Sequence, residues 1–90
     1  MELIGEEFKP VQIKLFSILA DRLGDEIVLD LPNKLTGVMV LDQMKETYPD
    51  LASVIDQCRI AINQTFIDLS NEVKLTDVKE IAIIPPVSGG

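Results

Sequence analysis

The sequence contains no histidine and only one cysteine, Cys58. These absences exclude the usual zinc and haem ligand sets and every histidine-based catalytic triad or dyad. A lone cysteine has no partner for an internal disulfide, which is typical of a reducing cytosol. Basic residues are also scarce, because 8 lysines and arginines stand against 15 acidic residues, for a formal net charge of −7. This balance argues against binding to nucleic acids or anionic membranes, since neutralising phosphates requires clustered basic side chains.

Long apolar runs are absent as well. No stretch approaches the roughly 20 apolar residues that a membrane-spanning helix needs. The N-terminus, residues 1–7, is acidic and lacks the apolar segment of a signal peptide. We therefore expect a soluble, cytoplasmic protein. Apolar residues make up 47% of the 90 residues, which is enough for the core of one domain.

Alternating and helical apolar spacings predict the order of the elements. The predicted elements are strands over 11–16 and 26–31, a short helix capped by Ser17 and ended by Gly24, a main helix from Thr36 to Tyr48 with an apolar stripe of Val38, Leu41, Met44 and Tyr48, a second short helix capped by Asp50, and strands over 59–62, 66–67 and 80–84. One long helix on one face of a mixed sheet is an α+β arrangement. The expected fold is the β-grasp of ubiquitin-like proteins, with about five strands, one main helix and short extra helices.

The C-terminal end carries most of the functional information. We predict an N-terminal extension over 1–10, a β-grasp domain over 11–86 and a flexible tail over 87–90. Pro85 and Pro86 cannot extend a strand ladder and stiffen the exit from the sheet. The last four residues, Val87 to Gly90, span at most roughly 13–14 Å when extended. The three residues after Val87 have a small side chain or none. Such a tail suits a narrow channel, with the terminal carboxylate as its leading group.

Three stretches make the chain resemble the small subunits of molybdopterin synthase, a family of ubiquitin-like sulfur carriers. They are Lys14-Leu15-Phe16-Ser17 running to Leu23-Gly24, then Ala61 to Phe66, and above all Ile83-Ile84-Pro85-Pro86-Val87-Ser88-Gly89-Gly90. The resemblance covers about residues 11–90, and the last eight residues are its specific part.

The resemblance implies a carrier rather than an enzyme. A ubiquitin-activating-like adenylyltransferase would adenylate the carboxylate of Gly90 with ATP, and a sulfur donor would displace AMP to leave a C-terminal thiocarboxylate (1-thioglycine). The large subunit of molybdopterin synthase would use that sulfur in molybdenum cofactor biosynthesis, and the two subunits would form a heterotetramer. Val87, Ser88 and Gly89 would form the threading tail. The resemblance implies no bound cofactor, no metal ligands and no catalytic residues in this chain.

The sequence departs from the family in two places. The family commonly has a Gly-Asp-Glu turn before the last strand, whereas this chain has Asp77-Val78-Lys79-Glu80. Valine is a poor occupant of a position with positive φ, so we expect a remodelled turn. The acidic extension over 1–10 is also unusual.

A partner-binding surface is expected beside the tail. Alternation places Phe16 and Ile84 on the solvent faces of the first and last strands, which are neighbours in a β-grasp sheet. Phe66 is expected to join them, since family members commonly carry apolar residues at these three positions. With Pro85 and Pro86, these residues form the predicted docking surface.

Other functions remain open at this stage. Sulfur carriers for thiamine, cysteine or tRNA thiolation share the fold and the terminal Gly-Gly. A ubiquitin-like modifier would use the same activation but end in an isopeptide bond to a lysine. A plain interaction domain would leave the tail idle, so that removing Gly90 would leave its function intact.

Overall fold

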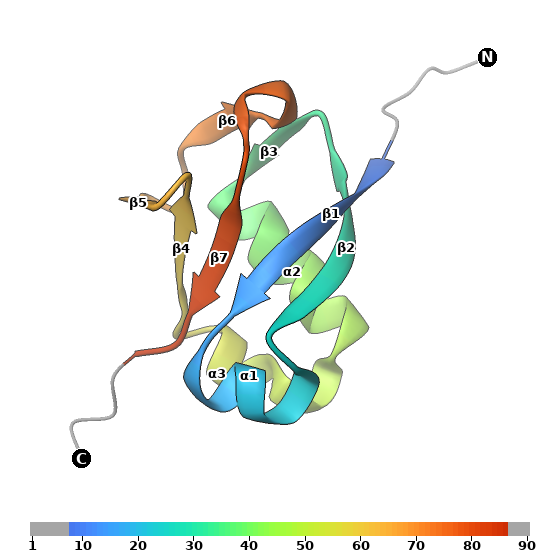
Figure 1. Cartoon of the computed structure of the whole chain (residues 1–90), viewed down its shortest axis with the longest axis vertical. Coiled ribbons are helices and arrows are strands. Elements are labelled where there is room, and N and C mark those ends of the chain that lie inside the picture. The colour runs from blue at the N-terminus through green and yellow to red at the C-terminus, as the bar shows by residue number, and fades with distance from the viewer. Residues whose placement is uncertain (1–7, 87–90) are drawn as a thin grey trace.

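A computed structural model describes residues 8–86 (Figure 1). Its strands and α-helices, in chain order, are β1 (Phe8–Leu15), α1 (Ser17–Leu23), β2 (Glu26–Pro32), β3 (Lys34–Thr36), α2 (Gly37–Thr47), α3 (Ala52–Ile55), β4 (Arg59–Ile62), β5 (Thr65–Ile67), β6 (Glu72–Lys74) and β7 (Ile81–Ile84). Single 3-10 turns over Pro49–Leu51 and Leu75–Asp77 precede α3 and β7. The predictions for 1–7 and for the tail over 87–90 lie outside the described residues.

Five strands form one mixed sheet in the order β2-β1-β7-β4-β5. The first and last strands, β1 and β7, are parallel neighbours, with Ile13 opposite Ile81, and the other pairs are antiparallel. The main helix α2 covers one face of this sheet (Figure 1). These features confirm the predicted α+β fold with a mixed five-stranded sheet. The two short strands β3 and β6 pair with each other in a second sheet, which the sequence did not predict.

The first strand begins at Phe8, three residues before the predicted start at Val11. Its alternation is as predicted, because Ile13 and Leu15 are buried whereas Lys14 is exposed. Phe16 follows the strand but keeps an extended backbone, with φ −138° and ψ 160°. Its side chain therefore continues the exposed side of the alternation.

The first helix ends as predicted but does not begin as predicted. Gly24 ends α1 with φ +95°, and its N–H donates to the carbonyl of Ala20. The predicted cap at Ser17 is wrong, because Phe16 holds the N-cap position and no side chain caps the helix. Ser17 instead turns the chain sharply, with φ +56°.

The cap of the main helix is confirmed, since Thr36 Oγ1 accepts a hydrogen bond from the Met39 N–H at 3.2 Å. The predicted apolar stripe is correct at Leu41 and Met44, which are buried, but wrong at Val38, which is 44% exposed. The first turn of α2 buries Gly37 and Val40 instead. Gly37 packs so closely on Leu69 that an added Cβ would lie 2.9 Å from the Leu69 Cα. Because Gly37 faces the core, Val38, the second residue of the helix, points away from it.

The second short helix is shorter than predicted and has no cap from Asp50. The N-cap of α3 is Leu51, and no side chain caps it. Leu51, Ile55 and Cys58 are buried in the core. Burial raises the pKa of the Cys58 thiol to about 11, and Sγ donates to the Val54 carbonyl at 3.3 Å. Cys58 is therefore a packing residue.

Of the helices within residues 8–86, none is both long and apolar enough to cross a bilayer.

Candidate functional site

The candidate site lies where the central strand β7 leaves the sheet. After Ile84, Pro85 and Pro86 carry no N–H groups, so the strand ladder ends there. Pro85 is buried, whereas Pro86 is exposed. Both line a shallow groove of about 200 Å³ together with Ile18 and Val54. The chain beyond Pro86, including Gly90, is outside the described residues.

Two of the predicted docking residues lie side by side at this exit. Leu15 of β1 is opposite Ile83 of β7, so the next positions of the two parallel strands are Phe16 and Ile84. Phe16 is 44% exposed and Ile84 is half-buried. Because their neighbours Leu15 and Ile83 are buried toward α2, Phe16 and Ile84 belong to the opposite face of the sheet.

Phe66 reaches the same face from the next strands across the sheet. It is opposite Ala61 of β4, and Ala61 is in turn opposite Ala82 of β7. Arg59, the register partner of Ile84, places its guanidinium carbon 4.0 Å from the centroid of the Phe66 ring. Arg59 therefore connects Phe66 to the end of β7 through a cation–π contact.

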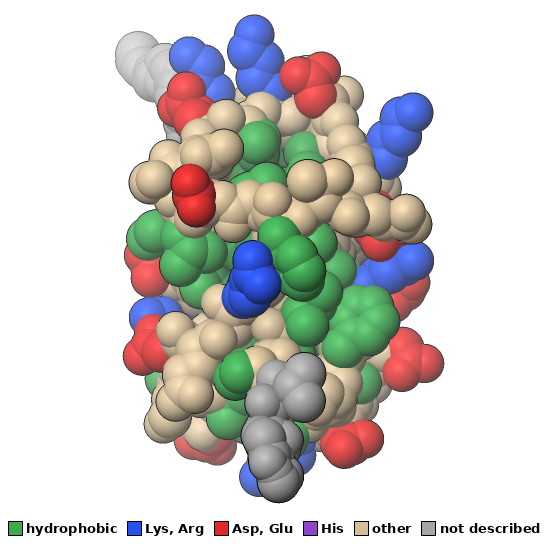
Figure 2. Space-filling model, turned by 90° about the vertical axis from the view of Figure 1, so that its left-hand side faces the viewer, with side chains coloured by type: hydrophobic (Ala, Val, Ile, Leu, Met, Phe, Trp, Pro, Cys, Tyr) green, Lys and Arg blue, Asp and Glu red, His purple; other side chains and the backbone are tan. Residues whose placement is uncertain are grey.

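We call this surface the exit patch and define it as Phe16, Arg59, Phe66, Ile84 and Pro86. Figure 2 shows hydrophobic side chains gathered on the side of the molecule that carries β4 and β5, around one basic side chain. The exit patch thus combines two exposed aromatic rings with one cation at the point where the tail begins. Aromatic residues and arginine are the types enriched at the centres of protein interfaces.

Arg59 was not among the docking residues predicted from the sequence. It lies with Ala61 on the face of β4 opposite Ile60 and Ile62, which are buried. Ala61 and Ala82 lie on this outward face yet are only 5% and 3% exposed. The register of β4 with β5, which brings Arg59 to Phe66, is not readable from alternation alone.

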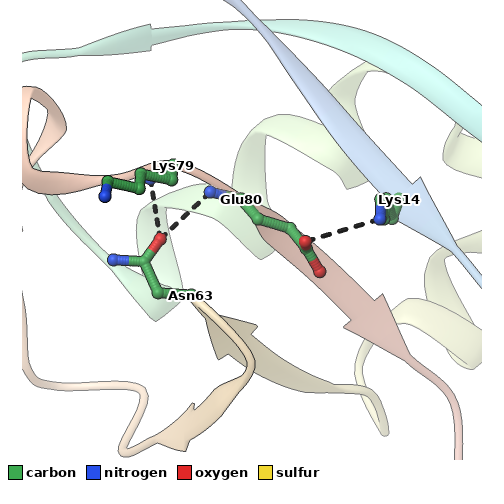
Figure 3. Close-up of polar contacts among 4 residues, drawn as sticks. All are labelled: Lys14, Asn63, Lys79 and Glu80. Carbon is green, nitrogen blue, oxygen red and sulfur yellow. Dashed lines mark hydrogen bonds and ion pairs between the residues drawn. The ribbon is translucent and has the colours of Figure 1, made fainter.

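The turn before β7 is held by one side chain from the β4–β5 hairpin (Figure 3). Asn63 Oδ1 accepts from the N–H groups of Lys79 at 2.7 Å and Glu80 at 3.1 Å, and Nδ2 donates to the Asp77 carbonyl at 3.0 Å. Val78 is extended there, with φ −95° and ψ 125°. The turn therefore differs from one that requires glycine, as expected, because Val78 occupies it with a negative φ.

An ion pair joins the first strand to the residue that precedes β7. Lys14 Nζ lies 3.4 Å from Glu80 Oε1 in a partly exposed ion pair (Figure 3). Such pairs contribute at most about 1 kcal/mol to stability. Residues 8–86 also contain no group of three or more side chains that could hold a metal ion.

Comparison with known proteins identifies relatives along nearly the whole chain. The ThiS family model matches residues 13–90. The molybdopterin synthase sulfur carrier subunit of Dictyostelium discoideum is 37% identical over 89 residues, which cover 97% of this chain and 100% of that protein. The subunit of the same name from Aedes aegypti is 32% identical and covers 96% and 94%, respectively.

Two solved structures share the fold. SAMP1 from Haloferax volcanii superposes with a TM-score of 0.68 at 26% identity, covering 91% of this chain and all of that one. A chain in the complex of subunits 1 and 2 of the molybdopterin-converting factor from Helicobacter pylori gives a TM-score of 0.54 at 23% identity, with the same coverage. At that identity the second likeness shows the fold alone.

Proposed function

This chain belongs to the ThiS family, and from that premise we propose that it is a sulfur carrier of molybdopterin synthase. Its relatives of comparable length are named molybdopterin synthase sulfur carrier subunits. The single observation that carries the proposal is the 37% identity to such a subunit over 97% of this chain. The family match over residues 13–90 extends through the terminal Gly-Gly. In this function Gly90 is the group that is modified, and the chain itself catalyses nothing.

The proposed chemistry takes place at the carboxylate of Gly90. A carboxylate is a poor electrophile, so an adenylyltransferase first joins it to the AMP part of ATP and releases pyrophosphate. A sulfur donor then attacks the acyl carbon, AMP leaves, and a C-terminal thiocarboxylate results. Its sulfur is a soft nucleophile comparable to a cysteine thiolate. Gly89 and Gly90 leave the approach to that carbon unobstructed because they have no side chains.

The exit patch is proposed to dock the partners that act on the tail. The large synthase subunit and the adenylyltransferase must each hold the domain while the tail reaches their active sites. Phe16, Phe66 and Ile84, flanked by Pro85 and Pro86, supply the apolar contact, and Arg59 supplies a charged one. We propose a heterotetramer in the cytoplasm, with this chain bound to the large subunit.

The experiment that tests the carrier function examines Gly90 directly. The protein is incubated with an activating enzyme, ATP and a sulfur source, then alkylated, and its C-terminal peptide is mapped by mass spectrometry. We expect alkylated sulfur on Gly90 and none in a chain that lacks this residue. A tail that is adenylated but never receives sulfur would indicate a protein modifier. An unreacted tail beside a competent control carrier would refute the proposal.

The docking role of the exit patch has a separate test with a matched control. Phe16→Glu places a charge in the patch, and Val38→Glu places one at an equally exposed apolar position, 44%, on α2, which covers the other face of the sheet. We expect Phe16→Glu to weaken binding to the large subunit at least tenfold and Val38→Glu to leave it unchanged. Normal folding and undiminished binding of Phe16→Glu to both partners would show that the patch is not the docking surface.

A further inference from the structure

A second groove lies along the outer edge of β2, away from the exit patch. It has a volume of about 180 Å³ and runs between this strand and α2. Its apolar lining includes Phe8, Pro32 and Met39, and its acidic lining includes Asp30, Asp42 and Glu46. Phe8 is 54% exposed and Met39 is 37% exposed, so a ligand in this groove would meet open apolar surface.

The strand that borders the groove has a free edge. β2 is the first strand of the sheet order and pairs only with β1 among residues 8–86. The outer edge of such a strand presents unpaired N–H and C=O groups. An extended segment of another protein binds this kind of edge by adding a strand, and adjacent pockets then select its side chains. β2 is seven residues long, which is long enough to pair with an added strand of ordinary length.

The charge of the groove decides which segment fits. Asp42 Oδ1 lies 3.6 Å from Lys45 Nζ, but that lysine is also hydrogen bonded to Asp56. Asp30 and Glu46 add two more carboxylates, whereas the nearest basic residue in the ladder is Lys9, opposite Leu31. A second copy of this chain would bring the same acidic edge into contact and be repelled. Residues 1–7 carry three glutamates and are disfavoured for the same reason.

We propose that this groove binds an extended, basic segment of a partner protein as an additional strand on β2. Lysine or arginine side chains of the segment would lie against Asp30, Asp42 and Glu46, and its apolar side chains would contact Phe8 and Met39. The groove begins at the Phe8 end of β1, whereas the exit patch begins after its other end, roughly 25 Å away for eight residues of strand. Figure 1 shows these ends on opposite sides of the molecule, so both surfaces are accessible at once.

The test uses a synthetic seven-residue peptide of alternating lysine and valine, blocked at both ends. Added to the full chain labelled with ¹⁵N, it is expected to shift the amide signals of residues 27–31 and of the first turns of α2, and to slow amide exchange along β2. The double variant Asp42→Lys, Glu46→Lys is expected to weaken binding at least tenfold. A matched double variant, Asp21→Lys with Asp50→Lys, changes two exposed acids outside the groove and is expected to bind as the wild type does.

Several results would overturn the proposal. Equal weakening of peptide binding in both double variants would mean that the peptide is attracted to the net charge of the protein and not to the groove. Amide shifts confined to the exit patch would mean that the peptide binds there instead. Equal binding of a glutamate–valine peptide would remove the charge argument. Shifts that appear without peptide and depend on protein concentration would assign the groove to a second copy. Since none of these readouts involves Gly90, they are independent of the sulfur carrier function.

Discussion

The contact of Asn63 with the turn before β7 gives a sharp prediction about stability. We expect Asn63→Ala to destabilise the protein by about 2–3 kcal/mol. The change removes three hydrogen bonds, to Asp77, Lys79 and Glu80, and each contributes about 0.5–1.5 kcal/mol net. Two of the bonds share one acceptor and all are exposed, which places their sum near 2 kcal/mol. Asn63 also has φ +53°, a conformation that alanine tolerates less well than asparagine.

Two further substitutions separate these contributions. Asn63→Gly removes the hydrogen bonds but accepts φ +53°, so the difference between the glycine and alanine variants reports the backbone conformation. Asn63→Asp retains the Oδ1 acceptor for the N–H groups of Lys79 and Glu80 and loses the donor to Asp77. We expect the stability order wild type, Asp, Gly, Ala.

Urea unfolding followed by circular dichroism measures these differences. With a slope of about 1 kcal/mol per molar urea for a domain of this size, Asn63→Ala shifts the midpoint by about 2–3 M. A loss below about 0.5 kcal/mol, with the slope unchanged, would refute the reasoning and show that the turn is held without Asn63.

Three other substitutions and conditions have defined outcomes. Gly37→Ala is expected to lower the free energy of unfolding by about 1–2 kcal/mol in the same assay, because the new Cβ meets the Leu69 backbone at 2.9 Å and the resulting strain exceeds a gain of at most about 1 kcal/mol in helix propensity; an unchanged midpoint would contradict this packing. Gln64→Gly is expected to stabilise the hairpin by about 1 kcal/mol, since Gln64 has φ +70° and an exposed side chain; a lower midpoint would show that its side chain contributes. Folding raises the pKa of the Cys58 thiol from its ordinary value near 9 to about 11, so stability is retained below pH 9 and lost as the pH rises toward 11. Iodoacetamide at pH 8 should therefore modify Cys58 only after unfolding, and the stability of Cys58→Ala should fall less between pH 9 and 11; rapid modification of the folded chain would refute its burial.

Local patterns predicted the parts of the fold that depend on one segment at a time. The alternation in β1 and β2, the cap at Thr36 and the glycine that ends α1 all follow from residues close together in the chain. The errors concern features of the fold that depend on contacts between residues far apart in the chain. Val38 is exposed because Leu69, 31 positions away (38 to 69), determines how the first turn of α2 packs and accepts a hydrogen bond from the Val38 N–H. The pairing of β3 with β6 has no signal in either three-residue stretch.

The candidate site was predictable to a similar degree. Phe16 and Ile84 were placed together because the β-grasp order makes the first and last strands neighbours. Arg59 was not predicted as part of the site, since its contact with Phe66 depends on the register between β4 and β5. The groove beside β2 was also unpredictable, because it combines the edge of a strand with the side of a helix.

The central position of β7 sets the point in synthesis at which the sheet can close. Its pairing with β1 joins residues 68 positions apart (13 to 81), so the middle of the sheet closes only after residue 81 has left the ribosome. Without β7 the strands β1 and β4 have no neighbour between them. A nascent chain cut short before residue 81 would therefore not fold into this sheet. Completion of the last strand is therefore the condition for closing the sheet and forming the surface that contains Ile84.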